Sequence, residues 1–237
     1  MALPTGLTAL EHRDFRLFWV SQFVSLIGTW MQSLGQSWLV LELTNSPFKL
    51  GAISALQFLP MLFLSVFGGV ISDRLPKRRL IVATQTALAL QALALAALTW
   101  TGHVQYWHVA VLALLFGTIN TIDMPTRQSF IIELVGRDHL TNAIALNSAA
   151  FNGARIIGPA IAGIVIARFG EGPAFFLNGL SFLPVIGALL AVRTEGLPHL
   201  GVGSSVLGDI REGIGYALRT PLVAFVPVRV ASHPGLF

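Results

Sequence analysis

Cysteine is absent from this 237-residue sequence, and charged residues make up only 11% of it. Soluble domains typically carry about 25% charged residues. The absence of thiols excludes disulfide scaffolds and thiolate metal sites, and so few charges could not cover the surface of a soluble protein of 25.5 kDa. We therefore expect no cofactor, and a chain whose outer surface does not face water.

Hydrophobic residues are abundant instead. They form 54% of the chain, and the mean hydropathy is +0.73, which is ordinary for helices whose outer faces contact lipid. Fifteen Lys and Arg against eleven Asp and Glu give a net charge of +4 and a pI of about 10.3. In a soluble protein this excess would favour nucleic acid, but here we expect membrane lipid as a partner and no nucleic acid.

Six apolar runs approach or exceed the length of about 20 residues that a helix needs to cross a bilayer. They predict spans over residues 15–41, 48–72, 80–101, 105–123, 142–167 and 174–192. We expect an all-α integral membrane protein in which residues 15–193 form a six-helix bundle. The first run is much longer than a signal-peptide core and follows Glu11 and Asp14, so we expect it to remain in the mature protein.

The cations are distributed unevenly over the connections between these spans. One side collects eleven Lys and Arg residues, whereas the other side has only Lys49 and Arg168. Because loops rich in Lys and Arg stay cytoplasmic, this bias predicts a multi-pass protein of the plasma (inner) membrane with both ends in the cytoplasm. Residues 1–14 would then form a cytoplasmic N-terminus.

The sequence after the sixth span is polar at first and then apolar again. Residues 194–220 predict a cytoplasmic linker, in which apolar residues at helical spacing indicate an amphipathic helix at the membrane interface. Residues 221–237 begin like a seventh span, but Pro227, Arg229 and Pro234 interrupt it. We expect an aborted seventh span or an aberrant C-terminus in an apparently truncated chain.

Polar side chains recur at helical spacing on one face of the first span. They are Gln22, Ser25, Thr29, Gln32 and Gln36. Such a stripe needs hydrogen-bond partners or water. Either it forms hydrogen bonds between packed helices, or it lines a water-filled substrate cavity. Because glutamine is bulky for a tight helix contact, we predict the cavity.

The fifth span carries Asn152 and Arg155 on one face, with Arg155 near its midpoint. A cation at that depth is costly unless it faces water, a counter-ion or backbone carbonyls. Either Arg155 ties helix ends together, or it contacts an anionic or polar substrate, and we predict the second role. Small residues around a proline in the same span predict close helix packing, namely Ala154, Gly158, Pro159, Ala162 and Gly163.

The loop between the second and third spans reads GVISDRLPKRR over residues 69–79. It resembles the G-x-x-x-D-R-x-G-[RK]-[RK] signature of major facilitator superfamily transporters, with Pro76 in place of the usual glycine. Gly69 would allow close helix contact, and the basic run would anchor the loop at the anionic cytoplasmic surface. The resemblance implies a cytoplasmic gate with Arg127 as a candidate partner for Asp73; its motif residues are Gly69, Asp73, Arg74, Lys77, Arg78 and Arg79.

Further segments, from HRDFRLFW to ALNSAAFNGARIIGPA, are similar to the superfamily branch that contains the enterobactin exporter and predicted multidrug efflux proteins. The resemblance covers about residues 8–220 and implies the amino-terminal half of a twelve-helix fold, built from two inverted three-helix repeats. It implies a secondary active transporter that exports a small amphipathic or anionic compound, such as a siderophore or drug, by alternating access. Proton antiport is implied as well, and the candidate coupling residues are Glu42 and Asp123.

Two other interpretations stay open. In the first, the chain is a non-functional fragment, or a half-transporter that needs a partner. That partner would be either a second six-helix half or a second copy of the chain. A membrane enzyme is the least favoured, because the sequence contains no G-x-S-x-G, H-E-x-x-H or phosphate-binding glycine motif. We expect no catalytic residues and no metal ligands.

Overall fold

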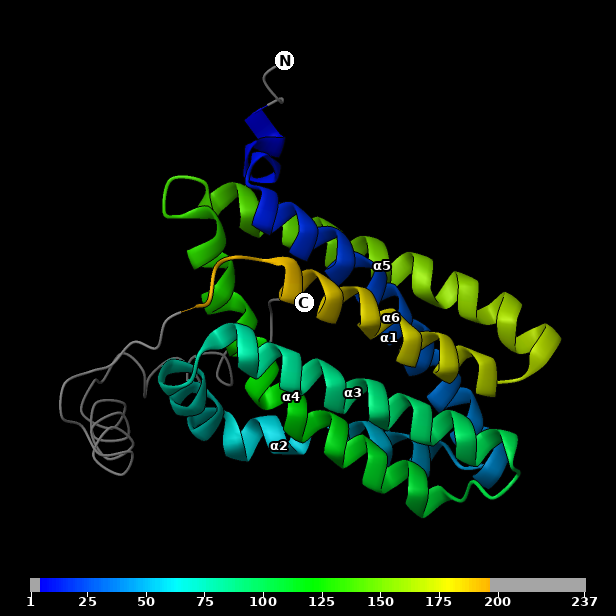
Figure 1. Cartoon of the computed structure of the whole chain (residues 1–237). Coiled ribbons are helices and arrows are strands. Elements are labelled where there is room, and N and C mark those ends of the chain that lie inside the picture. The colour runs from blue at the N-terminus through cyan, green and yellow to red at the C-terminus, as the bar shows by residue number, and fades with distance from the viewer. Residues whose placement is uncertain (1–4, 197–237) are drawn as a thin grey trace, which may run out of the picture. The chain divides into compact units, whose positions relative to one another are not determined.

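The computed structural model describes residues 5–196, and the predicted amphipathic helix and seventh apolar run lie outside them. Within these residues the chain is entirely helical (Figure 1). A short 3-10 helix, η1 (Thr5–Glu11), precedes six α-helices. These are α1 (Arg13–Thr44), α2 (Pro47–Arg74), α3 (Lys77–Trp100), α4 (Tyr106–Val135), α5 (Leu140–Phe169) and α6 (Gly172–Ala191). The predicted all-α class is confirmed.

Each predicted span corresponds to one of these helices. Five of them, α2 to α6, are long and apolar enough to cross a membrane. Helix α1 does not meet that criterion, because its 32 residues carry the polar stripe. The largest difference is in α4, which continues to Val135 instead of ending at Asp123. Asp123 and Arg127 therefore lie one turn apart within this helix. Because their opposite charges compensate each other, the helix does not have to end before them.

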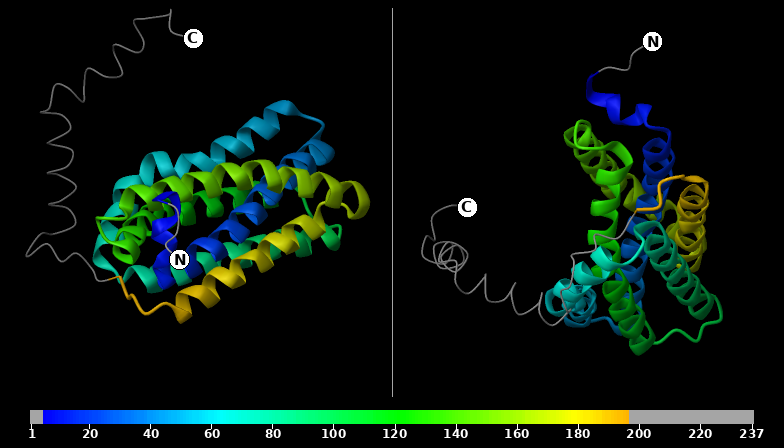
Figure 2. Two further views of the ribbon diagram at one scale, coloured as in Figure 1. Left: turned by 90° about the horizontal axis from the view of Figure 1, so that it is seen from above. Right: turned by 60° about the vertical axis from the view of Figure 1, so that its left-hand side comes forward.

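The helices pack in an order that differs from their order in the chain (Figures 1 and 2). Helix α4 packs against α2 and α3, helix α1 packs against α5 and α6, and α3 packs against α6. Exchanging α1 with α4, α2 with α5 and α3 with α6 leaves this set of neighbours unchanged. This pattern is that of two related three-helix repeats, as in one half of a major facilitator fold.

Short connections make consecutive helices antiparallel, so the second repeat starts at the opposite end from the first. Between α1 and α2 the chain reverses at Asn45, which has a φ of 46°, and Ser46, whose hydroxyl accepts from the Lys49 N–H at 3.4 Å. Between α2 and α3, Pro76 has a φ of −58°. That value suits proline, so this turn needs no glycine.

Glycines allow the close approach of α2 and α4. A Cβ atom at Gly117 of α4 would overlap the Gln57 carbonyl of α2, and one at Gly68 of α2 would overlap the Thr121 carbonyl of α4. Gly69, in contrast, has no neighbouring atom within 4 Å of a Cβ placed there. The helix contact predicted for Gly69 is therefore made by Gly68, because the face of α2 that meets α4 is one residue earlier.

Apolar clusters fill the two ends of the bundle. Phe15, Phe18 and Phe130 are buried in one cluster, where α1 and α3 begin and α4 ends. Val40 and Phe175 are buried in another, where α1 ends and α6 begins. Polar interior side chains such as Gln32 and Asp123 lie on the helices between these ends.

Candidate functional site

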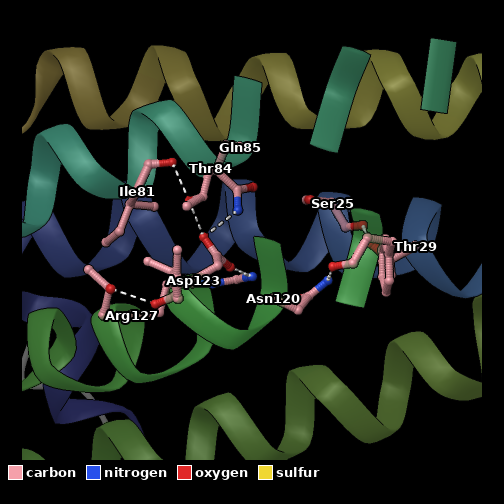
Figure 3. Close-up of polar contacts among 11 residues, drawn as sticks. Ser25, Thr29, Ile81, Thr84, Gln85, Asn120, Asp123 and Arg127 are labelled. Atoms are coloured by element: carbon pink, nitrogen blue, oxygen red, sulfur yellow. Dashed lines mark hydrogen bonds and ion pairs between the residues drawn. The ribbon is translucent and has the colours of Figure 1, made fainter. Parts of the chain in front are cut away.

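A buried charged cluster joins α3 to α4 (Figure 3). The side chain of Asp123 is fully buried and forms an ion pair with Arg127, one turn later in α4. The same carboxylate accepts a hydrogen bond from Gln85 Nε2 at 3.0 Å and lies 2.5 Å from Thr84 Oγ1. Both partners belong to α3. An interior carboxylate is costly unless it is paired and hydrogen-bonded, and here both conditions are met.

This cluster replaces the ion pair that the sequence predicts between Asp73 and Arg127. In the structure Arg127 pairs with Asp123, and Asp73 is exposed near the end of α2. Asp123 and Arg127 are four residues apart, so they lie on the same face of one helix. Their pairing therefore requires less ordering of the chain than an ion pair between two helices.

The basic run of the signature loop is divided between the interior and the surface. Lys77 is fully buried, and its Nζ lies 2.6 Å from Glu133 Oε1 of α4. Arg78 donates to the Val192 carbonyl at 2.8 Å. Arg79 is exposed. The predicted surface anchor is therefore wrong for Lys77, because Glu133 provides a counter-ion inside the bundle.

The segment after α6 crosses the ends of α1 and α3. The main-chain N–H of Lys77 donates to the Gly196 carbonyl at 2.9 Å, and thus satisfies one of the donors that a helix start leaves open. Asp14 Oδ2 of α1 accepts from the N–H groups of Arg193 and Thr194 at 3.0 and 3.3 Å. The signature loop, α1 and this segment are therefore joined at one end of the bundle.

The polar stripe of α1 faces the interior of the described bundle. Gln22, Ser25, Gln32 and Gln36 are each at most 4% exposed. Gln32 Nε2 donates to Gln91 Oε1 of α3 at 3.1 Å, and Gln32 Oε1 accepts from Asn178 Nδ2 of α6 at 2.7 Å. For Gln32 the cavity prediction is corrected in favour of hydrogen bonds between helices, because α3 and α6 supply amides long enough to meet its side chain.

Thr29 is partly buried, and its hydroxyl donates to the Ser25 carbonyl of the preceding turn at 2.9 Å. Figure 3 shows it with Ser25 on α1 and with Asn120 on α4. The Oε1 atoms of Gln22 and Gln36 are buried without a hydrogen-bond partner in the structure. The stripe therefore combines satisfied and unsatisfied polar groups, and only part of it acts as a link between helices.

Arg155 of α5 is exposed and lies over an aromatic ring of α1. Its guanidinium carbon is 5.6 Å from the centre of the Trp30 ring. Phe151, one turn earlier, meets the same indole at 5.7 Å and an angle of 69°. Asn152 is also exposed, and its Nδ2 donates to the Ser148 carbonyl at 2.8 Å. A cation, two aromatic rings and an amide oxygen thus share one face.

The small residues of α5 fix the distance between this helix and α1. Ala154, Gly158 and Ala162 are buried, and a Cβ atom at Gly158 would lie 2.6 Å from Trp30 Cβ. Pro159 is partly buried within the helix. Gly163 has no neighbouring atom within 4 Å of a Cβ placed there. The close contact at Gly158 holds Trp30 within reach of Arg155.

Glu42, the other candidate coupling residue, lies in the last turn of α1 beside Glu171, the residue before α6. Burial raises the pKa of Glu171, a backbone hydrogen bond partly offsets this, and the hydrogen bond to Glu42 and its charge raise the pKa further. Two neighbouring carboxyl groups favour a state in which one of them keeps its proton. This pair lies where α1 ends, and Lys77 and Glu133 lie where α3 begins and α4 ends.

The described residues thus form six helices in two related triplets, with ion pairs inside the bundle and a cation midway along α5. A family model described as "Transmembrane secretion effector" matches residues 4–233. The chain therefore belongs to this family of the major facilitator superfamily.

Proteins of known annotation are similar over most of the chain. The staphyloferrin A transporter of Staphylococcus aureus is 31% identical over 68% of this chain and 41% of its own length. The multidrug efflux pump Tap of Mycolicibacterium fortuitum is 29% identical over 84% of this chain and 51% of its own. The macrolide efflux protein A of Streptococcus pyogenes is 24% identical over 79% and 45%. The chain spans about half the length of the curated relatives it matches.

Sequence reasoning missed several residues of these clusters. It named neither Glu133 nor Thr84, Gln85, Trp30 or Glu171. The spacing of Asp123 and Arg127 was a usable signal, because opposite charges four residues apart pair along a helix. The partners on other helices carried no such signal, because their contacts depend on how the helices cross.

Proposed function

We propose that the chain is the amino-terminal half of an efflux transporter that exports a small amphipathic or anionic compound, such as a siderophore or a drug, by alternating access. The observation that carries this proposal is Arg155, an exposed cation midway along an apolar spanning helix. A cation at that depth needs an aqueous path or an anionic partner. The names of the relatives, which include exporters of drugs and a siderophore transporter, support the direction and the range of compounds.

A second six-helix half would complete this path. Helices α2 and α5 are the least buried of the five apolar helices, and the chain matches only 41% and 51% of the length of two relatives. A cavity between two halves would give Arg155 and Asn152 an aqueous surface. The alternative, a half-transporter that pairs with a second copy of itself, would bury the same helices.

We propose proton antiport with Asp123 as the coupling group. Its carboxylate is buried, and its partner Arg127 retains partial exposure. Protonation of Asp123 would neutralise its half of the ion pair, and would leave Arg127 free to bind another anion. Glu42 is the second candidate, since it lies beside Glu171 at the other end of the bundle and its charge raises the pKa of Glu171.

The cytoplasmic gate would be built around the signature loop. We propose that Asp73 and Arg74 close against the second half, and that Lys77 holds the loop to α4 through Glu133. This assignment places both ends of the chain in the cytoplasm and the protein in the plasma membrane, as the bias of Lys and Arg predicts.

An export assay tests the function. We would produce the chain in an efflux-deficient bacterium, once alone and once together with the second half of a related exporter. We would then measure how much of a fluorescent drug and of a catecholate siderophore the cells retain. We expect export that stops when the proton gradient is collapsed. Export should also be lost in Arg155→Ala and Asp123→Asn at unchanged membrane insertion. Wild-type retention equal to that of cells without the protein, in both settings, would refute the proposal.

A further inference from the structure

We propose that the face formed by Arg155, Trp30 and Phe151 binds a carboxylate that is attached to a flat apolar body. This proposal rests on the proposed function and specifies its substrate class. The carboxylate would accept hydrogen bonds from the guanidinium N–H groups of Arg155, and the apolar body would lie along the two aromatic rings.

The guanidinium of Arg155 has donors to offer. Within residues 5–196 its partner is the ring of Trp30, and no carboxylate lies within ion-pair distance of it. A ring face contacts the guanidinium as a cation–π partner and uses none of its five N–H groups. These groups match the two oxygens of a carboxylate in a bidentate geometry that an ammonium group cannot reproduce.

Packing fixes the position of the indole beside the guanidinium. Gly158 lies one turn beyond Arg155 and brings α5 so close to α1 that a Cβ atom there would lie 2.6 Å from Trp30 Cβ. Phe151 contacts the same indole in an edge-on arrangement. The cation therefore lies on an aromatic surface held by two helices, and a bound anion would not have to order a mobile side chain first.

The aromatic rings select for an amphipathic ligand. Phe151 is 41% exposed, so the pair offers apolar area next to the charge. A flat unsaturated ring stacks favourably on such surfaces. A cationic compound of the same shape would be repelled by Arg155, and a neutral one would lose the charge-assisted hydrogen bonds.

The depth of Arg155 favours a dissolved ligand over a lipid headgroup. Fifteen residues of α5 precede it and fourteen follow it, which corresponds to about 22 Å of helix toward each end. Headgroups lie near the helix ends, so an anion that reaches Arg155 must enter along an aqueous path.

Three probes that share a naphthalene body and carry an anionic, a neutral or a cationic head test the proposal. We would measure the binding of 2-naphthoate, 2-naphthamide and 2-naphthylmethylammonium to the full chain in lipid nanodiscs, by titration calorimetry and saturation-transfer NMR. We expect 2-naphthoate to bind at least tenfold more tightly than the other two. Equal binding of the three, or no binding of 2-naphthoate, would overturn the proposal.

Variants locate the site. Arg155→Gln should weaken 2-naphthoate at least tenfold, and Trp30→Leu should weaken it while keeping the preference for the carboxylate. Arg168→Gln, at the exposed end of the same helix, is the matched control and should bind like wild type. Arg155→Lys keeps the charge but loses the planar guanidinium, so it should bind 2-naphthoate several-fold more weakly. This variant provides the test if Arg155→Gln does not fold. Wild-type affinity in Arg155→Gln or Arg155→Lys would refute the site.

The two proposals can fail separately. Binding of 2-naphthoate that depends on Arg155, in a protein that exports nothing, would uphold the site and refute the export function. Export that continues unchanged in Arg155→Gln would uphold the export function and refute the site.

Discussion

Lys77 of α3 and Glu133 of α4 form an ion pair of 2.6 Å in which the lysine is fully buried. The two residues are far apart in the sequence, one at the start of α3 and the other near the end of α4. Their contact fixes the signature loop to the second three-helix repeat. A change at either residue therefore tests whether the two repeats are coupled at this end.

Removal of Glu133 alone should destabilise the bundle. Glu133→Gln would break the ion pair of the buried Lys77 ammonium, and breaking a buried pair costs about 3 kcal/mol or more. The double variant Lys77→Met, Glu133→Leu should recover most of this loss, because it buries no charge. Unfolding in detergent with increasing denaturant would give the free energies. A double variant as unstable as Glu133→Gln would contradict this account.

Two adjacent glycines of α2 should respond differently to the same substitution. Gly68→Ala places a methyl group against the Thr121 carbonyl, a main-chain atom that cannot turn aside, and overpacking of this kind costs about 1–3 kcal/mol. Gly69→Ala meets open space and is the matched control. Thermal unfolding of both variants checks this. The expected order is reversed if the signature glycine itself supports the bundle.

The stability of the bundle should depend on pH through Glu171. A raised pKa means that the folded state holds the proton more tightly than the unfolded state. The contribution of Glu171 is thus complete in acid and is lost as the pH rises through its raised pKa. Glu171→Gln should therefore unfold at a higher temperature than wild type at pH 7.5, and lose this advantage near pH 4.

Two controls accompany this experiment. Glu42→Gln removes the neighbouring charge and should stabilise the protein at pH 7.5 for the same reason. Glu11→Gln changes an exposed carboxylate in η1, where the chain begins, and should leave the pH dependence as it is. A wild-type protein more stable than Glu171→Gln at pH 7.5 would show that the two carboxyl groups do not oppose each other.

The alternation of the helices puts the connections at Ser46 and His103 at one end of the bundle and the connection at Pro76 at the other, and the bias of Lys and Arg predicts that the end with Pro76 is cytoplasmic. Reporter enzymes fused at Ser46 and at His103 should be active outside the cytoplasm, and a reporter fused at Pro76 should be active inside it. Alkaline phosphatase and a fluorescent protein give complementary signals in these positions. Cytoplasmic activity at Ser46 or His103 would reverse the assignment.

The sequence alone predicts the helices well because all six are long and five of them are strongly apolar. It ends the fourth span at Asp123, whereas α4 continues to Val135. Asp123 and Arg127 look like residues of a surface loop when each charge is considered without its partner. It likewise places Lys77 at the membrane surface, because its partner Glu133 is 56 residues away. Charges that neutralise each other across helices remain hidden until the packing is known.

The outcome for the polar residues follows the same logic. Periodicity shows that Gln32 shares a face with the other polar residues of α1, but not whether that face meets water or another helix. Gln91 and Asn178 decide the matter for Gln32. For Arg155, the depth in the helix follows from the sequence, whereas the indole beside it depends on where Gly158 lets α1 and α5 cross.

The main chain that leaves α6 has a mechanical consequence for the signature loop. Gly196 has a φ of 68° and no room for a side chain beside Lys77 and Phe130, and its carbonyl accepts from the Lys77 N–H. A pull on the polypeptide at this point is therefore transmitted directly to the start of α3 and, through Glu133, to α4. The exit from the bundle is thus a point at which tension in the following chain would reach the signature loop.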